Sequence, residues 1–273
     1  MSCLTPLWGD MGRIYAIVLA AGKGSRMHSE KPKQFMEIDG HEVLWYSLKA
    51  MEESCVTDVV VVTSAEYVEY VRREYLENAG FKKIQTVVAG GYERYDSVYE
   101  GLRAICGLKQ PDSGSLVLIH DGARPMVTPE LIARTAEGAA KHKACIPGIP
   151  VKDTVRFIGE DGSCGATPDR SQLRAVQTPQ AFDLKLCCKA YKKLHSGQLA
   201  ADRITDDAMV VEAACGVKAM FVDGDYSNIK ITTPEDILTA ERFLGVLKTN
   251  QIMYSVSDYE DDLRTVAELK KMV

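Results

Sequence analysis

Residues Ile14 to Gln34 read IYAIVLAAGKGSRMHSEKPKQ, and this stretch carries the strongest indication of the fold. The apolar run Ile17-Val18-Leu19 predicts a buried strand that ends in the small-residue turn 20–24. Glycines at the end of a strand leave backbone N–H groups open to an anion, because no Cβ stands in the way. Arg26 and Lys33 follow the turn and add mobile positive charge. The combination suits a polyphosphate better than a single carboxylate.

Other glycine-loop interpretations fit this stretch less well. The dinucleotide fingerprint G-x-G-x-x-G needs a small residue where Met27 stands, and the P-loop pattern with Gly-Lys-Ser/Thr is missing. A tight turn behind a buried strand, followed by a solvated basic loop, is the alternative that requires no ligand.

The composition limits the classes of function. The chain has 273 residues, enough for one large domain or two small ones, and its formal charge of −5 gives no overall basic field for nucleic acid. No apolar stretch approaches the roughly 18–20 residues that cross a bilayer, and residues 1–12 lack the pattern of a secretory signal. We therefore expect a cytoplasmic protein that binds neither nucleic acid nor membrane, and whose anion-binding charge is local.

The cysteines show no C-x-x-C pair and no spacing typical of metal ligands. Most are expected to be small buried hydrophobic residues in a reducing cytoplasm. They are Cys3, Cys55, Cys106, Cys145, Cys164, Cys187, Cys188 and Cys215.

Apolar runs alternate with amphipathic stretches in the first half of the chain. Strands are expected at 59–62, 84–89 and 116–119, and helices at about 66–78, at about 92–106 and from Thr128-Pro129. This alternation predicts an α/β fold with a mostly parallel sheet covered by helices on both faces. The carboxyl ends of the strands then meet at one edge, which carries Gly22, Gly90 and Asp121 and is where such sheets bind ligands.

The pattern changes after Pro150. Residues 151–177 lack helical periodicity and predict an extended β-arm, whose open edges another subunit would cover. Helices near 183–195 and 206–214, a strand at 217–222 and a helix from Pro234 complete the pattern. We expect a single domain over residues 12–244 and a C-terminal extension over 245–273, with one helix at about 261–272 and no role in chemistry.

Polar residues at the strand ends are candidates for chemistry. Asp121, at the end of an apolar strand, is well placed to hold hydrated Mg²⁺ or a ribose hydroxyl, and a structural Asp121–Arg124 ion pair is the competing interpretation. His120 is expected to be packed rather than catalytic. On the extended segment 228–231, Lys230 can face a phosphate while Ile229 and Ile231 face the core.

The candidate site is rich in cations and poor in general bases, which suits phosphoryl-group chemistry. A phosphate monoester, with a second pKa of about 6, is itself a competent nucleophile near neutral pH.

The order of the polar motifs resembles that of the 2-C-methyl-D-erythritol 4-phosphate cytidylyltransferases. The resemblance covers about residues 14–244 and, with seven motifs in register, is highly specific. It implies a Rossmann-like nucleotidyltransferase fold, a homodimer embraced by the β-arm, and transfer of CMP from CTP in non-mevalonate isoprenoid synthesis. The motifs are AAGKGSRM (20–27) with Pro32-Lys33-Gln34, GGYERYDSV (90–98), HDGARP (120–125), PVKDTV (150–155), DRSQL (169–173) with QTPQAF (177–182), TDDA (205–208) and NIKITTPED (228–236).

The resemblance also implies roles for individual residues. Arg26 and Lys33 would neutralise the CTP phosphates, which carry Mg²⁺, and no dedicated metal ligands are implied. Arg170 and Lys230 would position the acceptor phosphate for in-line attack. Contacts to the nucleotide are implied for Ala20, Ala21, Gly22, Gly24, Gly90, Ser97 and Asp121. Contacts to the acceptor are implied for Asp121, Arg124 and Thr154, with Thr154 supplied by the partner arm.

Two departures keep alternatives open. Ser227 stands where some members carry Asp, and here the chain resembles ribitol 5-phosphate cytidylyltransferases, whereas HDGARP and PVKDT favour the methylerythritol enzyme. Gly122 stands where other members have Ala. A nucleotide-binding protein without catalysis would be expected to lose Arg26, Lys33 or Lys230, and all three are present.

Overall fold

The computed structural model describes residues 12–22, 24–27, 29, 31–108, 112–200 and 204–255; beyond residue 245 it describes only the backbone of the last helix. The expected helix at 261–272 lies outside these residues.

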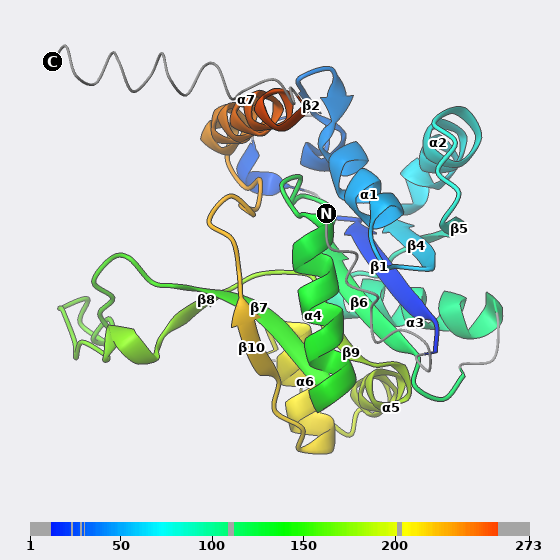
Figure 1. The fold of residues 1–273 in the computed structure, drawn as a ribbon. Coiled ribbons are helices and arrows are strands. Elements are labelled where there is room, and N and C mark those ends of the chain that lie inside the picture. The colour runs from blue at the N-terminus through cyan, green and yellow to red at the C-terminus, as the bar shows by residue number, and fades with distance from the viewer. Residues whose placement is uncertain are drawn as a thin grey trace, which may run out of the picture.

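An eight-stranded sheet forms the centre of the molecule (Figure 1). Strand β1 (Ile14–Ala20) is flanked on both sides by parallel neighbours, as expected for a strand that is apolar on both faces. The strands run in the order β10-β7-β9-β6-β1-β4-β5, with β8 paired to β7. Their bounds are β4 (Asp58–Thr63), β5 (Ile84–Ala89), β6 (Leu116–Asp121), β7 (Ala144–Pro150), β8 (Arg174–Val176), β9 (Gln180–Asp183) and β10 (Met220–Asp223). A hairpin of β2 (Glu37–Ile38) and β3 (His41–Glu42) stands apart.

Two strands of the central sheet, β7 and β9, are missing from the sequence analysis. Strand β9 runs antiparallel to both β6 and β7. It inserts between two strands that are parallel to each other, so the sheet is mostly rather than wholly parallel. The sequence QAFD does not predict this strand, because four residues are too few to show the alternation of polar and apolar side chains.

Helices cover both faces of the sheet, as predicted. They are α1 (Val43–Glu53), α2 (Val68–Val71), α3 (Arg94–Leu108), α4 (Pro129–His142), α5 (Leu184–His195), α6 (Asp207–Cys215) and α7 (Pro234–Ser255). Helix α4 begins where Thr128-Pro129 predicted, because the Thr128 side chain accepts a hydrogen bond from the Leu131 N–H at 3.2 Å. The segment expected as one helix at 66–78 is a 3₁₀ turn, then α2, then a π-helical stretch, Arg72–Asn78.

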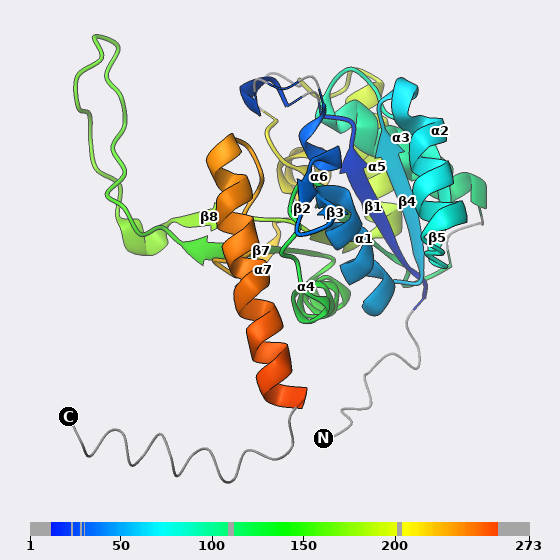
Figure 2. The same ribbon diagram turned by 90° about the horizontal axis from the view of Figure 1, so that it is seen from above.

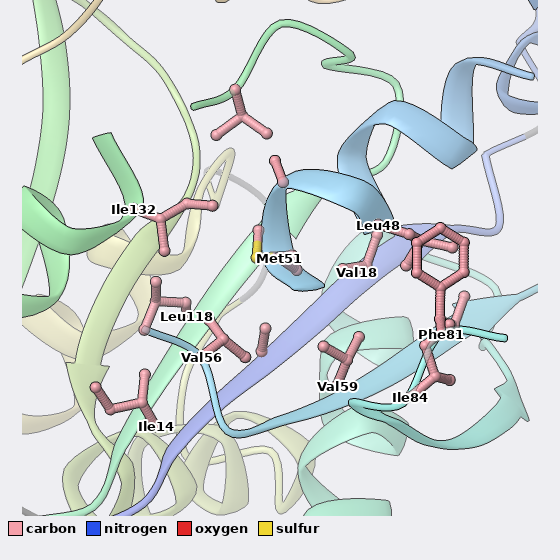
Figure 3. Packing of buried hydrophobic residues seen from close by; sticks show 14 of the residues in the cluster. Ile14, Val18, Leu48, Met51, Val56, Val59, Phe81, Ile84, Leu118 and Ile132 are labelled. Atoms are coloured by element: carbon pink, nitrogen blue, oxygen red, sulfur yellow. The ribbon is translucent and has the colours of Figure 1, made fainter. Parts of the chain in front are cut away.

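Two hydrophobic cores form because β1 alternates its side chains between the faces. Val18 points toward Leu48 and Met51 of α1 in the first core (Figure 3), to which α4 also contributes. Ile17 belongs to the second core, which packs under α3, α5 and α6. A third cluster joins α7 to the body through Ile231, and α7 itself continues through the predicted domain boundary at residue 244 as far as Ser255.

The segment after Pro150 leaves the body as a long projection (Figure 2). Regular pairing within it is limited to an isolated bridge between Ile158 and Cys164, and β8 pairs with β7 at its base. Phe157 and Ile158 are 64% and 84% exposed on this arm. The segment therefore projects from the body, but it contains less strand than the predicted β-arm.

The cysteines are less buried than expected. Cys145 and Cys187 are buried, whereas Cys106 and Cys164 are exposed and the remaining described cysteines are half-buried. The prediction that most are buried was therefore wrong for this chain, because α3 and α5 bring some of them to the surface. Within the described ranges, no helix combines the length and apolar character needed to cross a membrane.

Candidate active site

A cavity of about 580 Å³ opens at the edge where the carboxyl ends of β1, β4, β5 and β6 meet. Its walls come from residues 19–22, 64–65 and 90–94, from Asp121 and Ala123, and from Lys33-Gln34, Ser97 and Lys230. The cavity thus collects segments from across the chain at the edge predicted to bind the ligand.

The glycines of the cavity serve different purposes. A Cβ on Gly22 would have no heavy atom within 4 Å, so this backbone faces open space that a ligand can occupy. A Cβ on Gly90 would lie 2.6 Å from the Ser97 Oγ and 3.0 Å from the Ala21 Cβ, so glycine here permits close packing of two walls. Gly24 has a positive φ of 62°, which turns the chain beside the aliphatic part of Lys33.

Gln34 fixes the glycine turn, a role that the sequence analysis did not assign. Its side chain is 2% exposed, and its Nε2 donates to the Ala20 carbonyl oxygen at 2.6 Å and to that of Gly22 at 3.3 Å. The only signal was its place directly after Lys33 in the Pro32-Lys33-Gln34 motif.

Lys33 lines the cavity and contacts the segment that carries Lys230. Its Nζ donates to the Ile231 carbonyl oxygen at 2.7 Å. Burial, reinforced by the nearby charges of Lys230 and Arg26, lowers the pKa of Lys33 to about 8. The Lys33 ammonium is poorly solvated, so an anion that binds here would stabilise its charge strongly.

Asp121 lies at the end of β6 among three cations. Its Oδ2 is 2.7 Å from the Lys230 Nζ and 3.8 Å from the Arg124 Nε, and its Oδ1 is 3.3 Å from the Arg94 Nε. Burial alone would raise the pKa of Asp121, but Arg94, Lys230 and Arg124 together lower it well below its usual range. The carboxylate is therefore ionised at neutral pH and serves to hold the cations in place.

Arg94 is the second site residue without an assigned role in the sequence analysis. Its Nη1 and Nη2 each donate at 2.8 Å to the fully buried carboxylate of Asp207, while its Nε reaches Asp121. The Tyr191 hydroxyl donates to the same Asp207 carboxylate at 2.5 Å. Arg94 and Asp207 both stand inside quoted motifs, GGYERYDSV and TDDA, yet nothing in the sequence pairs them.

His120 is packed, as expected. It is fully buried, its Nδ1 lies 3.1 Å from the Thr178 Oγ1, and burial lowers its pKa to about 4. The same Thr178 hydroxyl accepts a hydrogen bond from the Asp121 N–H at 3.1 Å. A histidine that stays neutral and is closed off from the cavity supports the strand end rather than moving protons.

Five of the predicted site residues, Gly24, Arg26, Arg124, Thr154 and Arg170, lie outside the cavity walls in this single chain. Arg26 is exposed, close enough to Lys33 to affect its pKa. Thr154 and Arg170 are exposed on the arm, where the Arg170 Nη1 donates to the Lys152 carbonyl oxygen at 2.7 Å. Arg124 contacts Asp121 and donates from Nη1 to the Asn228 carbonyl oxygen at 2.8 Å. The predicted residues of the body therefore come together, and those of the arm do not join them within one chain.

The two sequence departures have local explanations. Ser227 forms a turn, because its N–H and its hydroxyl both donate to the Asp225 Oδ1 at 2.8 Å. A Cβ on Gly122 would lie 2.9 Å from the Leu44 Cδ1 and 3.0 Å from the Leu19 carbonyl oxygen, so glycine lets β6 end close to β1.

Glu93 and Asp121 are the carboxylates that line the cavity, and no group of three metal-ligating side chains occurs in the described part of the chain. One or two carboxylates fit Mg²⁺ that is held mainly by substrate phosphates.

The sheet is mostly parallel, and an open glycine turn with Lys33 and Lys230 lines a cavity large enough for a nucleotide. These features define the Rossmann-like nucleotidyltransferase class. The family model described as IspD, 2-C-methyl-D-erythritol 4-phosphate cytidylyltransferase, matches residues 14–246. The chain belongs to this family, and the resemblance stated from the motifs is confirmed.

Relatives and solved structures agree with this assignment. The cytidylyltransferase of this name from Lachnoclostridium phytofermentans is 47% identical over 234 residues, which cover 86% of this chain and 97% of the relative. The one from Caldanaerobacter subterraneus subsp. tengcongensis is 43% identical, covering 85% of this chain and 98% of the relative. The crystal structure of 4-diphosphocytidyl-2C-methyl-D-erythritol synthase from Anaerococcus prevotii is 35% identical with a TM-score of 0.72, covering 86% of this chain and 96% of that one. The Thermus thermophilus enzyme is 28% identical with a TM-score of 0.66, covering 84% and 97%.

Proposed function

We propose that the chain transfers CMP from CTP to 2-C-methyl-D-erythritol 4-phosphate, giving the CDP-alcohol and pyrophosphate, a step of non-mevalonate isoprenoid synthesis. The observation that carries the proposal is the cavity at the strand edge, whose wall brings together Lys33, Lys230 and Asp121. The alternatives, ribitol phosphate as acceptor and a catalytically inactive nucleotide-binding protein, are not favoured by the family match.

The nucleotide would occupy the glycine side of the cavity. The open backbone at Gly22 gives room for the phosphates, and Gly90 with Ser97 forms the wall against the cytidine. Lys33 and Arg26 would neutralise the triphosphate, because phosphoryl transfer relies on positioned positive charge. Ala20, Ala21, Gly24 and Asp121 complete the proposed nucleotide contacts.

The acceptor would bind on the side of Lys230. An oxygen of its phosphate attacks the α-phosphorus of CTP, the new P–O bond forms in line, and the bond to the β-phosphate breaks to release pyrophosphate. No general base is needed, because the phosphate dianion is already ionised near neutral pH. In the free enzyme, Lys230 forms an ion pair with Asp121. When the acceptor binds, the Lys230 ammonium would also interact with the acceptor phosphate. Arg124 lies near the same Asp121 oxygen at 3.8 Å and would contact the acceptor, as would Thr154 and Arg170 from the arm.

Mg²⁺ would arrive with the CTP phosphates and neutralise charge on them, and Asp121 and Glu93 are the carboxylates in the cavity wall that could contact it. We also propose a cytoplasmic homodimer in which the arm of one subunit completes the site of the other, because Phe157 and Ile158 of the arm are largely exposed in the described part of the chain.

The test is pyrophosphate release from CTP and Mg²⁺ with methylerythritol 4-phosphate and ribitol 5-phosphate as parallel acceptors. We expect release with the first and little with the second, and none after a chelator removes Mg²⁺. Release with ribitol phosphate alone would reassign the acceptor. A folded protein that binds CTP yet releases pyrophosphate with neither acceptor would overturn the reaction itself.

A further inference from the structure

A second cavity, of about 850 Å³, lies between the C-terminal end of α3 and the exposed side of α5. It is remote from the strand edge, since the active-site residue Arg94 stands at the opposite end of α3. Two thiols and a group of lysines line it: Cys106, Cys188, Lys185, Lys189, Lys192 and Lys193. The proposed reaction uses none of these side chains.

The two thiols are neighbours in space although 82 residues separate them in the chain. The Cys106 Sγ on α3 lies 3.9 Å from the Cys188 Sγ on α5, which is van der Waals contact between sulfur atoms. A disulfide bond of about 2.05 Å needs side-chain rotation and a small approach of the two helices. Cys106 is exposed and Cys188 half-buried, so a reagent can reach the pair, whereas the adjacent Cys187 is buried.

Lysine side chains and two cavities surround the Cys106–Cys188 pair. The lysines of α5 surround the larger cavity, and a smaller cavity of about 280 Å³, lined by Tyr99 and Leu102, opens at the same two cysteines. Positive charge beside a thiol stabilises the thiolate and attracts anions. Burial raises the pKa of Cys188 to about 12, against the opposing effect of Lys192, so the exposed Cys106 is the thiol that reacts first.

We propose that Cys106 and Cys188 form a thiol–disulfide exchange site for anionic low-molecular-weight disulfides. The Cys106 thiolate attacks one sulfur of such a disulfide, a mixed disulfide forms, and one thiolate leaves. Cys188 loses its proton and attacks the Cys106 sulfur, the Cys106–Cys188 bond forms, and the second thiolate leaves. The two cysteines are oxidised by two electrons, and the small disulfide is reduced to two thiols. The reaction is separate from cytidylyl transfer and does not depend on it.

The first test uses glutathione disulfide on the full chain, followed by alkylation of the free thiols and peptide mass mapping. We expect a Cys106–Cys188 cross-link in the unsubstituted protein and in Cys187→Ser, the matched control at the adjacent residue. Cys188→Ser is expected to stop at a glutathionyl group on Cys106, since the resolving thiol is gone. The cross-link closes a long loop and is expected to raise the melting temperature by roughly 5–10 °C, an increase that Cys106→Ser abolishes. Alkylation of both cysteines after oxidation, or pairing of either with another cysteine, would overturn the proposal.

The second test concerns the lysines. Anionic glutathione disulfide is expected to react faster than cationic cystamine, and the double variant Lys189→Gln/Lys192→Gln is expected to reduce this preference at least about threefold. Lys141→Gln on α4 serves as the control for a change of net charge. An equal rate with both disulfides in the unsubstituted protein would contradict the proposal that the lysine-lined cavity selects anionic disulfides.

Discussion

Lys33 combines a half-buried position with a positive charge that a bound anion would stabilise. Its Nζ has one carbonyl partner, and burial together with Lys230 opposes its protonation. Such a group weakens the free protein and strengthens the complex, because a bound phosphate supplies negative charge directly to the Lys33 ammonium.

Replacing Lys33 with Met separates these two effects. We expect turnover to fall at least about 100-fold, because a positioned cation at the transferring phosphate is lost. The free energy of unfolding is expected to rise by up to about 1 kcal/mol at pH 7, since the variant no longer buries the charge. Steady-state kinetics and urea unfolding measure the two, with Lys141→Met as an exposed control. Unchanged turnover would contradict the proposed role of Lys33 at the transferring phosphate.

The lowered pKa of Lys33 also predicts a pH dependence. The folded-state pKa of about 8 is below the ordinary lysine pKa of 10.5, so between these pH values the unfolded chain binds more protons at this residue. Stability conferred through Lys33 therefore rises with pH in that window, while CTP affinity falls as pH passes 8 and the cation is lost. Calorimetric titration of CTP from pH 7 to 9.5 measures the second effect. Lys33→Arg keeps its charge and should bind CTP with a flatter profile; an equally steep decline in this variant would contradict the assignment.

Helices α3 and α6 are connected by the ion pair between Arg94 and Asp207. Because Arg94 also contacts Asp121, this pair links the active-site carboxylate of Asp121 to the protein interior. The carboxylate of Asp207 is fully buried, and Arg94 is its guanidinium partner. The start of α3 is thereby fixed against α6, and the position of Asp121 depends on both helices.

Arg94→Ala is expected to lower the free energy of unfolding by about 3 kcal/mol, because it leaves a buried charge without its partner. Arg103→Ala, on the same helix, breaks only an exposed ion pair with Glu100 and is expected to cost less than about 1 kcal/mol. Chemical denaturation of the two variants makes the comparison. Equal losses would mean that the Arg94 pair is no more than a surface contact.

The whole molecule is a body with a projecting arm, and the proposed site needs both. Figure 2 shows the arm projecting from the body. The cavity lies on the body, and its lining includes neither Thr154 nor Arg170, which are exposed on the arm. A closed two-fold dimer would bring each arm to the other subunit and cover its exposed apolar residues.

Subunit mixing tests this arrangement. Lys33→Met inactivates the body, and Thr154→Glu is expected to repel the acceptor phosphate from the arm. If the arm acts in the partner's site, refolding equal amounts of the two variants together regenerates one intact site in each mixed dimer. About a quarter of the unsubstituted activity is then expected from random pairing. Sedimentation should show a dimer in each preparation, and a mixture as inactive as its components would place the arm outside the partner's site.

The elements that depend on local patterns were predictable. Strand β1, the turn at Gly22, the strand ends at Gly90 and Asp121 and the helix start at Thr128 all follow from residue types close together in the chain. The family resemblance, fold class and reaction are confirmed by the family match. The assigned site roles and the domain boundaries stay predictions.

What the sequence could not provide depends on contacts between distant segments. Arg94 and Asp207 are 113 residues apart, and Cys106 and Cys188 are 82 apart, so no local period relates them. The antiparallel insertion of β9 likewise depends on the space left between β6 and β7. The chain's own pattern of apolar and glycine residues settles which segments become strands and where the anion-binding turn lies, because steric and hydrophobic preferences act over a few residues. Tertiary packing alone decides which charges are buried together, since burial and the strength of each ion pair depend on what the rest of the fold places around them.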